Sequence, residues 1–223
     1  MKAYWVKTNR VIKKLFSNYV WDIPNKENKI YLTFDDGPTP EVTAWVLDQL
    51  KKYHAKATFF CIGKNIEQHP EIFKKIIEKG HTIGNHTFNH LNGWKTNTNE
   101  YIENSVQCSV AINQLTGHRT ADCILNSEHC KLFRPPYGKI KRAQAKKLRQ
   151  KGFKIIMWDV LSADFDQSIT KEKCLNNVIS NTQSGSIIVF HDSVKAFKNL
   201  EYVLPRALQY LAENNFSFET VKT

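Results

Sequence analysis

Residues 30–40 read IYLTFDDGPTP and run an apolar stretch directly into two adjacent carboxylates and a Gly-Pro break. The β-branched and aromatic residues at 30–34 predict a strand, which the Gly-Pro pair prevents from continuing. Because alternate strand residues point to opposite sides, we expect different roles for Asp35 and Asp36: one can bind a metal ion while the other faces a reacting group. The alternative is that the Asp-Asp-Gly-Pro tetrapeptide serves only turn chemistry.

Outward from this stretch, the chain alternates predicted strands and helices from Lys29 onward. The strands are expected at 29–35, 57–62, 81–85, 131–134, 154–159, 186–191 and 216–221. The helices are expected at 41–53, 70–79, 99–116, 139–151, 170–182 and 200–213. This alternation implies a parallel sheet covered by helices, and seven strands predict a distorted (β/α) barrel in a single α/β domain. Functional residues of such barrels gather at the C-terminal ends of the strands.

Size and charge fit one basic domain. A chain of 223 residues with 41% hydrophobic content can bury a well-packed core without dividing into two domains. The formal net charge of +11 is compatible with nucleic acid, an anionic membrane or an acidic polymer, and does not choose among them. Because the lysines are dispersed and form no long basic run, a solvated basic surface is favoured and no nucleic-acid partner is expected.

The five cysteines include no Cys-x-x-Cys pair, which favours neither a disulfide framework nor a structural zinc site. Cys61, Cys108 and Cys174 fall in strand and helix patterns, so buried free thiols are expected there. Cys123 and Cys130 bracket a polar segment and can either pair or stay reduced. The odd total and the lack of an export signal favour reduced thiols.

Residues 1–28 are expected to form an N-terminal helical extension packed on a domain of residues 29–223. The extension has no apolar core long enough for a signal peptide or a transmembrane segment, which makes the cytoplasm the default location. Its predicted helix has an apolar face of Val11, Ile12, Leu15, Phe16 and Tyr19, opposite the basic residues Arg10, Lys13 and Lys14. This face can either make peripheral contact with a membrane or close one end of the fold, which is the commoner use.

Ionisable residues recur where the predicted strands end. Besides the stretch at 30–40, the segments are HTFNH at 86–90, FRPPYG at 133–138, SADF at 162–165 and IIVFHD at 187–192. A helical turn would place His86 and His90 on one face, at a separation suited to one metal ion, although two unrelated surface histidines are the alternative. The two prolines of FRPPYG leave no backbone N–H until Tyr137. The Tyr137 N–H is therefore expected to be a single, rigidly held donor.

Taken in order, these five segments resemble the polysaccharide deacetylase family, the NodB homology domain of carbohydrate esterase family four. The resemblance covers residues 29–221. It implies a metal-dependent hydrolase that removes N-acetyl groups from N-acetylglucosamine-type units of a poly- or oligosaccharide and releases acetate. Chitin-like oligomers, peptidoglycan and a surface-polysaccharide precursor all remain compatible with it.

Carried over by motif, the resemblance makes Asp35 the general base, and it makes Asp36, His86 and His90 the metal ligands. One carboxylate and two imidazoles favour Zn²⁺, and would also accept Co²⁺ or Ni²⁺. The resemblance further implies that Arg134 orients the base.

Four further roles follow from the same resemblance. The Tyr137 N–H would bind the oxyanion, and His191 would be the general acid, supported by Asp164. Phe165 and Phe190 stand where Trp and Leu are usual, and both are expected in the pocket for the acetyl methyl group. These two departures put the size of the pocket in doubt, and leave the reaction as it is.

Two other functions stay open. A cytoplasmic metal-dependent amidohydrolase acting on a small non-carbohydrate N-acyl compound fits the missing export signal. A non-catalytic carbohydrate-binding module would be expected to lack a ligand or the base, and here none is missing. Specificity is expected in the loops. Residues 117–131 are longer than a minimal connection between helix and strand, and they can either shape one wall of the cleft or decorate the surface.

Overall fold

The computed structural model describes residues 4–116 and 131–222. Cys123 and Cys130, for which reduced thiols were favoured over a pair, lie outside these residues. Within them, Cys61, Cys108 and Cys174 are buried, as the sequence predicted, and Cys61 and Cys174 are free thiols.

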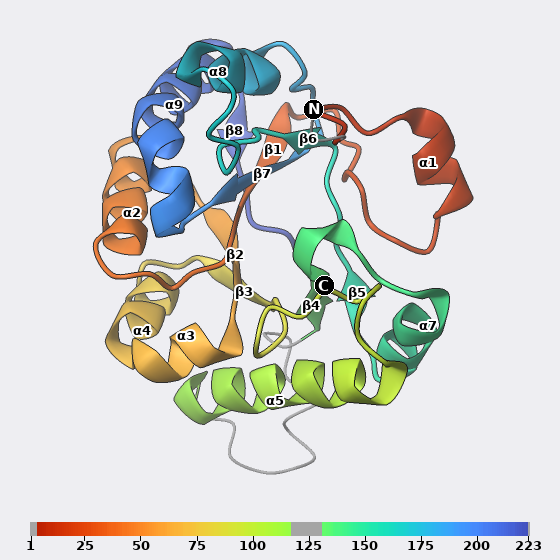
Figure 1. Ribbon diagram of the computed structural model, residues 1–223. Coiled ribbons are helices and arrows are strands. Elements are labelled where there is room, and N and C mark those ends of the chain that lie inside the picture. Colours follow the sequence, from red (N-terminus) through yellow and green to blue (C-terminus); the bar gives the residue numbers. More distant parts are fainter. Residues whose placement is uncertain (1–3, 117–130, 223) are drawn as a thin grey trace.

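A curled parallel sheet forms the centre of the molecule (Figure 1). Its strands are β1 (Lys29–Asp35), β2 (Ala57–Cys61), β3 (Thr82–Asn85), β4 (Leu132–Phe133), β5 (Lys154–Ile155), β6 (Val160–Leu161), β7 (Ile187–His191) and β8 (Ser217–Phe218). The order across the sheet is β5-β4-β3-β2-β1-β7-β6, and β8 pairs with β1. Because the named strands pair in parallel, their C-terminal ends meet at one edge, as expected for a distorted barrel.

Helices surround this sheet on the outside (Figure 1). They are α1 (Arg10–Leu15), α2 (Val42–Lys52), α3 (Gly63–Gln68), α4 (Pro70–Glu78), α5 (Thr98–Thr116), α7 (Arg142–Gln150), α8 (Lys171–Ile179) and α9 (Val194–Glu213), with a 3₁₀ turn η2 at Pro136–Gly138. The short helix α3 was not predicted. Helix α9 begins earlier than expected and contains Pro205.

The middle strand β1 is buried from Ile30 to Asp35. Phe34 has no exposed surface and stacks on Phe59 of β2 at 5.0 Å and on Phe190 of β7 at 5.7 Å between ring centroids. Burying one such side chain contributes about 1.5–3 kcal/mol, so these rings fix β1 between its two neighbours. The two acids that follow Phe34 are thereby held at a rigid strand end.

The strand predicted at 154–159 is wrong beyond Ile155, because the chain leaves the sheet and re-enters it as β6. The N-terminal extension forms backbone hydrogen bonds with this segment. The Val20 N–H donates to the Ile155 carbonyl at 2.8 Å, and the Met157 N–H donates to the Val20 carbonyl at 2.7 Å. Hydrogen bonds to the N-terminal extension therefore replace pairing with a neighbouring strand. The sequence pattern of residues 154–159 alone does not reveal this partner.

Polar contacts hold the N-terminal extension on the barrel. Lys7 and Lys13 place their ammonium groups 2.6 and 2.5 Å from the carboxylate of Asp159, which is fully buried. The expectation that the apolar face of α1 closes the fold is wrong for Val11 and Leu15, which are 70% and 65% exposed. The basic residues Lys7 and Lys13 hold the extension on the barrel, and the side chains of Val11 and Leu15 face solvent. Contact with a membrane surface stays a prediction.

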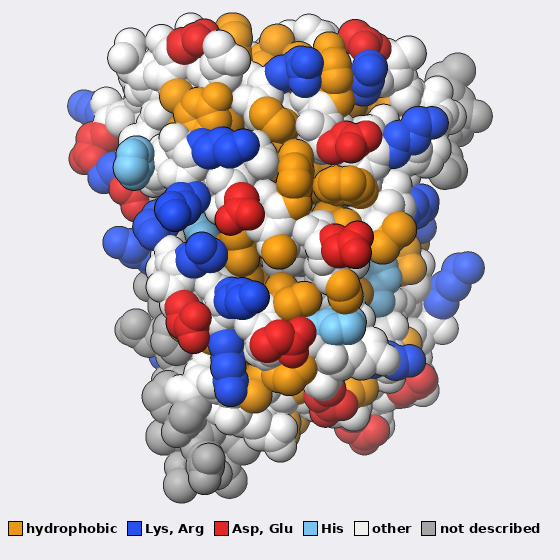
Figure 2. All heavy atoms as spheres, turned by 90° about the vertical axis from the view of Figure 1, so that its left-hand side faces the viewer, with side chains coloured by type: hydrophobic (Ala, Val, Ile, Leu, Met, Phe, Trp, Pro, Cys, Tyr) orange, Lys and Arg blue, Asp and Glu red, His pale blue; other side chains and the backbone are white. Residues whose placement is uncertain are grey.

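Charge is mixed on the face that Figure 2 shows, where Lys and Arg side chains are interspersed with Asp and Glu. This arrangement fits a solvated basic surface better than a nucleic-acid footprint. Among the described residues, no helix combines the length and the apolar character needed to cross a bilayer.

Candidate active site

The turn after β1 is built around a buried carboxylate that the sequence did not single out. Asp192 accepts a hydrogen bond from the Gly37 N–H at 3.0 Å and another from the Thr43 hydroxyl at 2.6 Å. A Cβ atom on Gly37 would lie 2.0 Å from Asp192 Oδ2, so this approach requires glycine. Asp36, just before it, has a φ of 81°, a left-handed conformation that non-glycine residues rarely adopt. The turn therefore points the carboxylates of Asp35 and Asp36 in different directions.

Asp35 is held by a fully buried guanidinium. Arg134 donates to Asp35 Oδ1 at 2.7 Å, which matches the predicted orienting role. The remaining donors of Arg134 bind the Thr33 hydroxyl at 2.7 Å and the backbone carbonyls of Ile156 at 3.2 Å and Met157 at 2.8 Å. These hydrogen bonds fix the orientation of the planar guanidinium. The guanidinium in turn fixes the orientation of the Asp35 carboxylate.

Replacing Arg134 with Met is expected to lower the free energy of unfolding by about 3–5 kcal/mol, because it leaves a buried carboxylate and two carbonyls without their partner. Urea unfolding followed by circular dichroism measures the change. Arg142→Met on α7, where the side chain is exposed, is the control and should change stability by less than about 0.5 kcal/mol. Equal stabilities of the two variants would contradict this role of Arg134.

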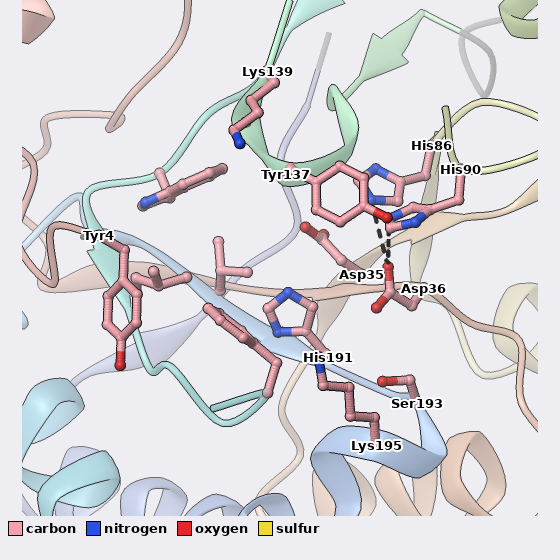
Figure 3. A pocket seen from close by; sticks show the side chains of 15 residues that line it. Tyr4, Asp35, Asp36, His86, His90, Tyr137, Lys139, His191, Ser193 and Lys195 are labelled. Atoms are coloured by element: carbon pink, nitrogen blue, oxygen red, sulfur yellow. Dashed lines mark ion pairs between the residues drawn. The ribbon is translucent and has the colours of Figure 1, made fainter. Parts of the chain in front are cut away.

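The side chains of Asp36, His86 and His90 converge, with ligand atoms that all lie within 4.8 Å of one another. Asp36 Oδ1 lies 3.6 Å from His86 Nε2 and 3.1 Å from His90 Nε2 (Figure 3). The helical turn predicted for the two histidines is wrong, since they lie in a loop in which Thr87 and His90 have φ values of 63° and 55°. The loop still brings both imidazoles to one carboxylate.

The protonation states suit a metal site. His86 Nδ1 lies 2.8 Å from the Arg134 carbonyl, to which it can donate, and this directs the Nε2 lone pair toward Asp36. Burial lowers the pKa of His86 to about 4, so the ring is neutral as a ligand must be. Burial alone would raise the pKa of Asp36, but the hydrogen bond with His90 and the nearby imidazoles hold it well below its usual range. One carboxylate and two imidazoles fit a divalent metal ion and leave coordination positions free for reactants.

His191 and Asp164 form a second ionic pair across the cavity. His191 Nδ1 lies 2.7 Å from Asp164 Oδ1, and the His191 N–H donates to Asp164 Oδ2 at 2.8 Å. Burial opposes the charged imidazolium, but the buried Asp164 carboxylate outweighs it and raises the pKa of His191 to about 9. His191 is therefore a cation at neutral pH, as a general acid must be.

Most of these groups line one cavity of about 540 Å³, while Arg134 and Asp164 are buried behind its wall. It brings together the predicted residues Asp35, Asp36, His86, His90, Tyr137, Phe165 and His191. The Tyr137 ring is 60% exposed and lies 4.6 Å from the His90 ring. Its N–H donates to no acceptor within residues 4–116 and 131–222, so the single donor predicted after the two prolines stays available to a ligand.

The expectation that Phe190 lies in the acetyl pocket is wrong. Its side chain is fully buried in the core against Phe34, and it does not line the cavity. Strand side chains alternate between the two sides of a sheet, so His191 and Val189 face the cavity while Phe190 faces the helices. Phe165 does line the cavity, and its ring packs edge-on against His191 at 5.0 Å.

Part of the cavity wall was not predicted. Tyr4 of the N-terminal extension lines it, donates its hydroxyl to Asp166 Oδ2 at 3.0 Å and packs edge-on against Phe165 at 5.6 Å. Lys139 and Lys195 also line the cavity. No local signal identifies Tyr4, because its partners lie about 160 positions along the chain; Lys139 stands one residue beyond the FRPPYG segment.

Comparison with known proteins matches most of the chain to the polysaccharide deacetylase family, which the sequence motifs resemble. The family model described as polysaccharide deacetylase matches residues 22–156. A peptidoglycan-N-acetylglucosamine deacetylase of Bacillus cereus is 37% identical over 175 residues, which cover 78% of this chain and 60% of the relative. A second one from the same species is 34% identical over 202 residues, 90% of each chain. Chitin deacetylase 2 of Saccharomyces cerevisiae is 37% identical over 75% of this chain, which spans 51% of its length.

Solved structures agree with the sequence matches. A crystal structure of a peptidoglycan N-acetylglucosamine deacetylase in complex with 4-naphthalen-1-yl-N-oxidanyl-benzamide has a TM-score of 0.82 at 34% identity, covering 92% of this chain and 91% of the other. A family 4 carbohydrate esterase from Streptomyces lividans in complex with acetate has a TM-score of 0.73 at 25% identity, covering 87% and 93%.

Proposed function

The chain belongs to the polysaccharide deacetylase family, and from this membership we propose that it hydrolyses the N-acetyl group of N-acetylglucosamine units in a glycan of the peptidoglycan or chitin type. The observation that carries the proposal is the single cavity that holds a three-ligand metal site, a fixed carboxylate and a cationic histidine together. Family members are metalloenzymes, and the chain retains a complete ligand set.

The residues divide the reaction between two sides of the cavity. Asp35, oriented by Arg134, accepts a proton from the water that attacks the acetamide carbonyl. The Tyr137 N–H donates to the carbonyl oxygen as negative charge develops on it. A divalent ion at Asp36, His86 and His90 would supply Lewis-acid polarisation and a more acidic water.

His191 completes the reaction from the opposite side. It protonates the departing amine, which leaves poorly as an anion, and Asp164 keeps the imidazole charged and oriented for this step. The products are acetate and a free amino sugar. Zinc is the metal we propose for this donor set, with cobalt and nickel as the next choices. A cytoplasmic location likewise stays a prediction.

The test is acetate release by the purified protein from N-acetylglucosamine oligomers and from small non-carbohydrate N-acyl compounds. We expect turnover of the oligomers, its loss after exhaustive chelation and its return with added Zn²⁺. Turnover of the small compounds alone would instead indicate a general amidohydrolase. Binding of oligomers with no acetate release from any substrate would indicate a carbohydrate-binding module.

Replacing Asp164 with Asn is expected to move the alkaline limb of the pH–kcat profile down by about 1–3 pH units. Protonated His191 is the active form, so activity falls as pH rises through its pKa, which is about 9 while Asp164 is charged. Without that charge, burial lowers the pKa and the fall begins earlier. Asp48→Asn, an exposed acid on α2, should leave the limb in place. An unchanged limb in Asp164→Asn would contradict this pairing.

A further inference from the structure

We propose that the cavity accepts acyl groups longer than acetyl, so that the protein also hydrolyses N-acyl amino sugars whose acyl chain has about three to six carbons. This inference rests on the proposed function and extends it to a further class of substrate. It is carried by an apolar part of the cavity that the reacting groups leave free.

Four side chains that line the cavity are aromatic or aliphatic and take no part in the reaction. We call them the apolar end, and they are Tyr4, Leu161, Phe165 and Val189. Figure 3 shows Tyr4 on the other side of His191 from Asp36 and the two histidines that converge on it. Asp166 holds the Tyr4 hydroxyl at 3.0 Å, which leaves the ring as the part of Tyr4 that faces the cavity.

The apolar end continues along strand β7 toward the interior of the barrel. His191 pairs with Asp35 at the strand ends, and Val189 pairs with Thr33 two residues earlier. Residues two apart in a strand share one face and lie about 6–7 Å apart, roughly the length of an alkyl chain of five carbons. Leu161 of β6 pairs with Val189, and these two side chains are 4% and 1% exposed. Aliphatic side chains therefore line the cavity below His191.

The two substituents of the amide differ in where they fit. The glycan is large and polar, and burying its hydroxyl groups without partners costs free energy, so it has to stay at the open side of the cavity. Tyr137 and Lys195 are exposed on that side. The acyl chain is apolar and gains free energy with each methylene that it buries. The apolar end therefore suits the acyl chain and not the sugar.

Phe165 stands where the acyl chain would enter the apolar end. Its ring packs edge-on against His191 at 5.0 Å and against Tyr4 at 5.6 Å, so it bridges the reacting groups and the N-terminal extension. The family resemblance places Trp at this position, and a phenyl ring is smaller than an indole. The departure from the family pattern leaves more room for the acyl group.

The reaction itself is the same for every acyl length. Water adds to the carbonyl carbon, the C–N bond breaks, and the amine leaves with a proton from His191. The products are the longer carboxylate and a free amino sugar. Only the number of methylenes that reach the apolar end changes.

The decisive experiment varies the acyl chain alone. Fully deacetylated chitotetraose is re-acylated to give N-acetyl, N-butyryl and N-hexanoyl tetrasaccharides, and the Zn²⁺-loaded protein is assayed for release of free amine from each. The quantity measured is the ratio of kcat/KM for the N-butyryl substrate to that for the N-acetyl substrate. We expect a ratio of roughly 10–20 in the unmodified protein, because each buried methylene contributes a factor of about four.

Variants of Leu161 test whether the apolar end carries this preference. Leu161→Phe places a ring there and should lower the ratio to about one or less. Leu161→Met has a similar volume and should keep the ratio of the unmodified protein. If Leu161→Phe does not fold, Val189→Ile, which adds one methylene to the same part of the cavity, takes its place and should lower the ratio by about four-fold.

Variants of Tyr4 test the far side of the apolar end. Tyr4→Ala removes the ring and should raise the rate for N-hexanoyl relative to N-butyryl substrate by roughly four-fold. Tyr4→Phe keeps the ring and should leave that comparison unchanged. If Leu161→Phe and Tyr4→Ala both slowed all acyl lengths by the same factor, the apolar end would contact the sugar, and the inference would be overturned.

Failure of this inference and failure of the proposed function give different results. Release of acetate with a butyryl-to-acetyl ratio below one in the unmodified protein would overturn the inference and leave the proposed function standing. If no acyl group is released from any substrate, binding of acetohydroxamic, butyrohydroxamic and hexanohydroxamic acids to the Zn²⁺-loaded protein, measured by calorimetry, decides. Affinity that rises by about four-fold per methylene in the unmodified protein but not in Leu161→Phe would support the inference, and equal affinities would overturn it.

Discussion

Replacing Asp35 with Asn is expected to lower the rate of acetate release by roughly 10²–10⁴, while the protein keeps its metal ion. The amide cannot accept the proton of the attacking water, yet it retains an oxygen for the hydrogen bond from Arg134. Because Asp35 is held by Arg134 and is not one of the three converging ligands, its replacement should leave Asp36, His86 and His90 in place. Metal content and turnover are measured on the same preparation.

The matched variant is Asp36→Asn, one position along the chain. Here the metal content itself should fall, because the site loses its only carboxylate among the three ligands. His86→Ala is expected to behave like Asp36→Asn, since it removes a buried neutral imidazole from the three ligands. If Asp35→Asn and Asp36→Asn lost metal equally, the division of roles between the adjacent acids would be wrong.

Replacing His191 with Ala is expected to slow N-deacetylation by orders of magnitude while sparing much of any activity toward an aryl acetate. An amine leaves poorly unless it is protonated, whereas a phenolate leaves as a stable anion and needs far less help from an acid. The comparison therefore isolates proton donation from every other effect of the substitution. Both rates and the metal content are measured, and the metal should be retained.

The control for this variant is Phe165→Ala. It removes the ring that packs against His191 at 5.0 Å but keeps the imidazole and Asp164. It should affect both substrates to a similar degree, because it alters the pocket wall and not the proton donor. His191 would have only a structural role if His191→Ala slowed the amide and the aryl ester by the same factor and left the alkaline limb unchanged.

The sequence by itself determined the sheet and the chemistry at its edge. Local patterns suffice for β1, because consecutive apolar residues followed by two acids and a Gly-Pro break admit few backbone conformations. The same holds for the segment at 133–138, where two prolines leave one donor at Tyr137. Asp35, Asp36, His86, His90 and His191 were all predicted, and all line one cavity, because parallel strands bring their C-terminal ends together.

Only the tertiary structure decided which neighbours complete the site. The direction of the Phe190 side chain depends on strand register, in which a one-residue difference exchanges the core face for the cavity face. Asp192 acquires its role through contact with Gly37 and Thr43, about 150 positions away. Tyr4 reaches the cavity because Lys7 and its neighbours bind the β6 edge. Side chains so far apart in the chain share no local period, so their meeting depends on how the whole barrel packs.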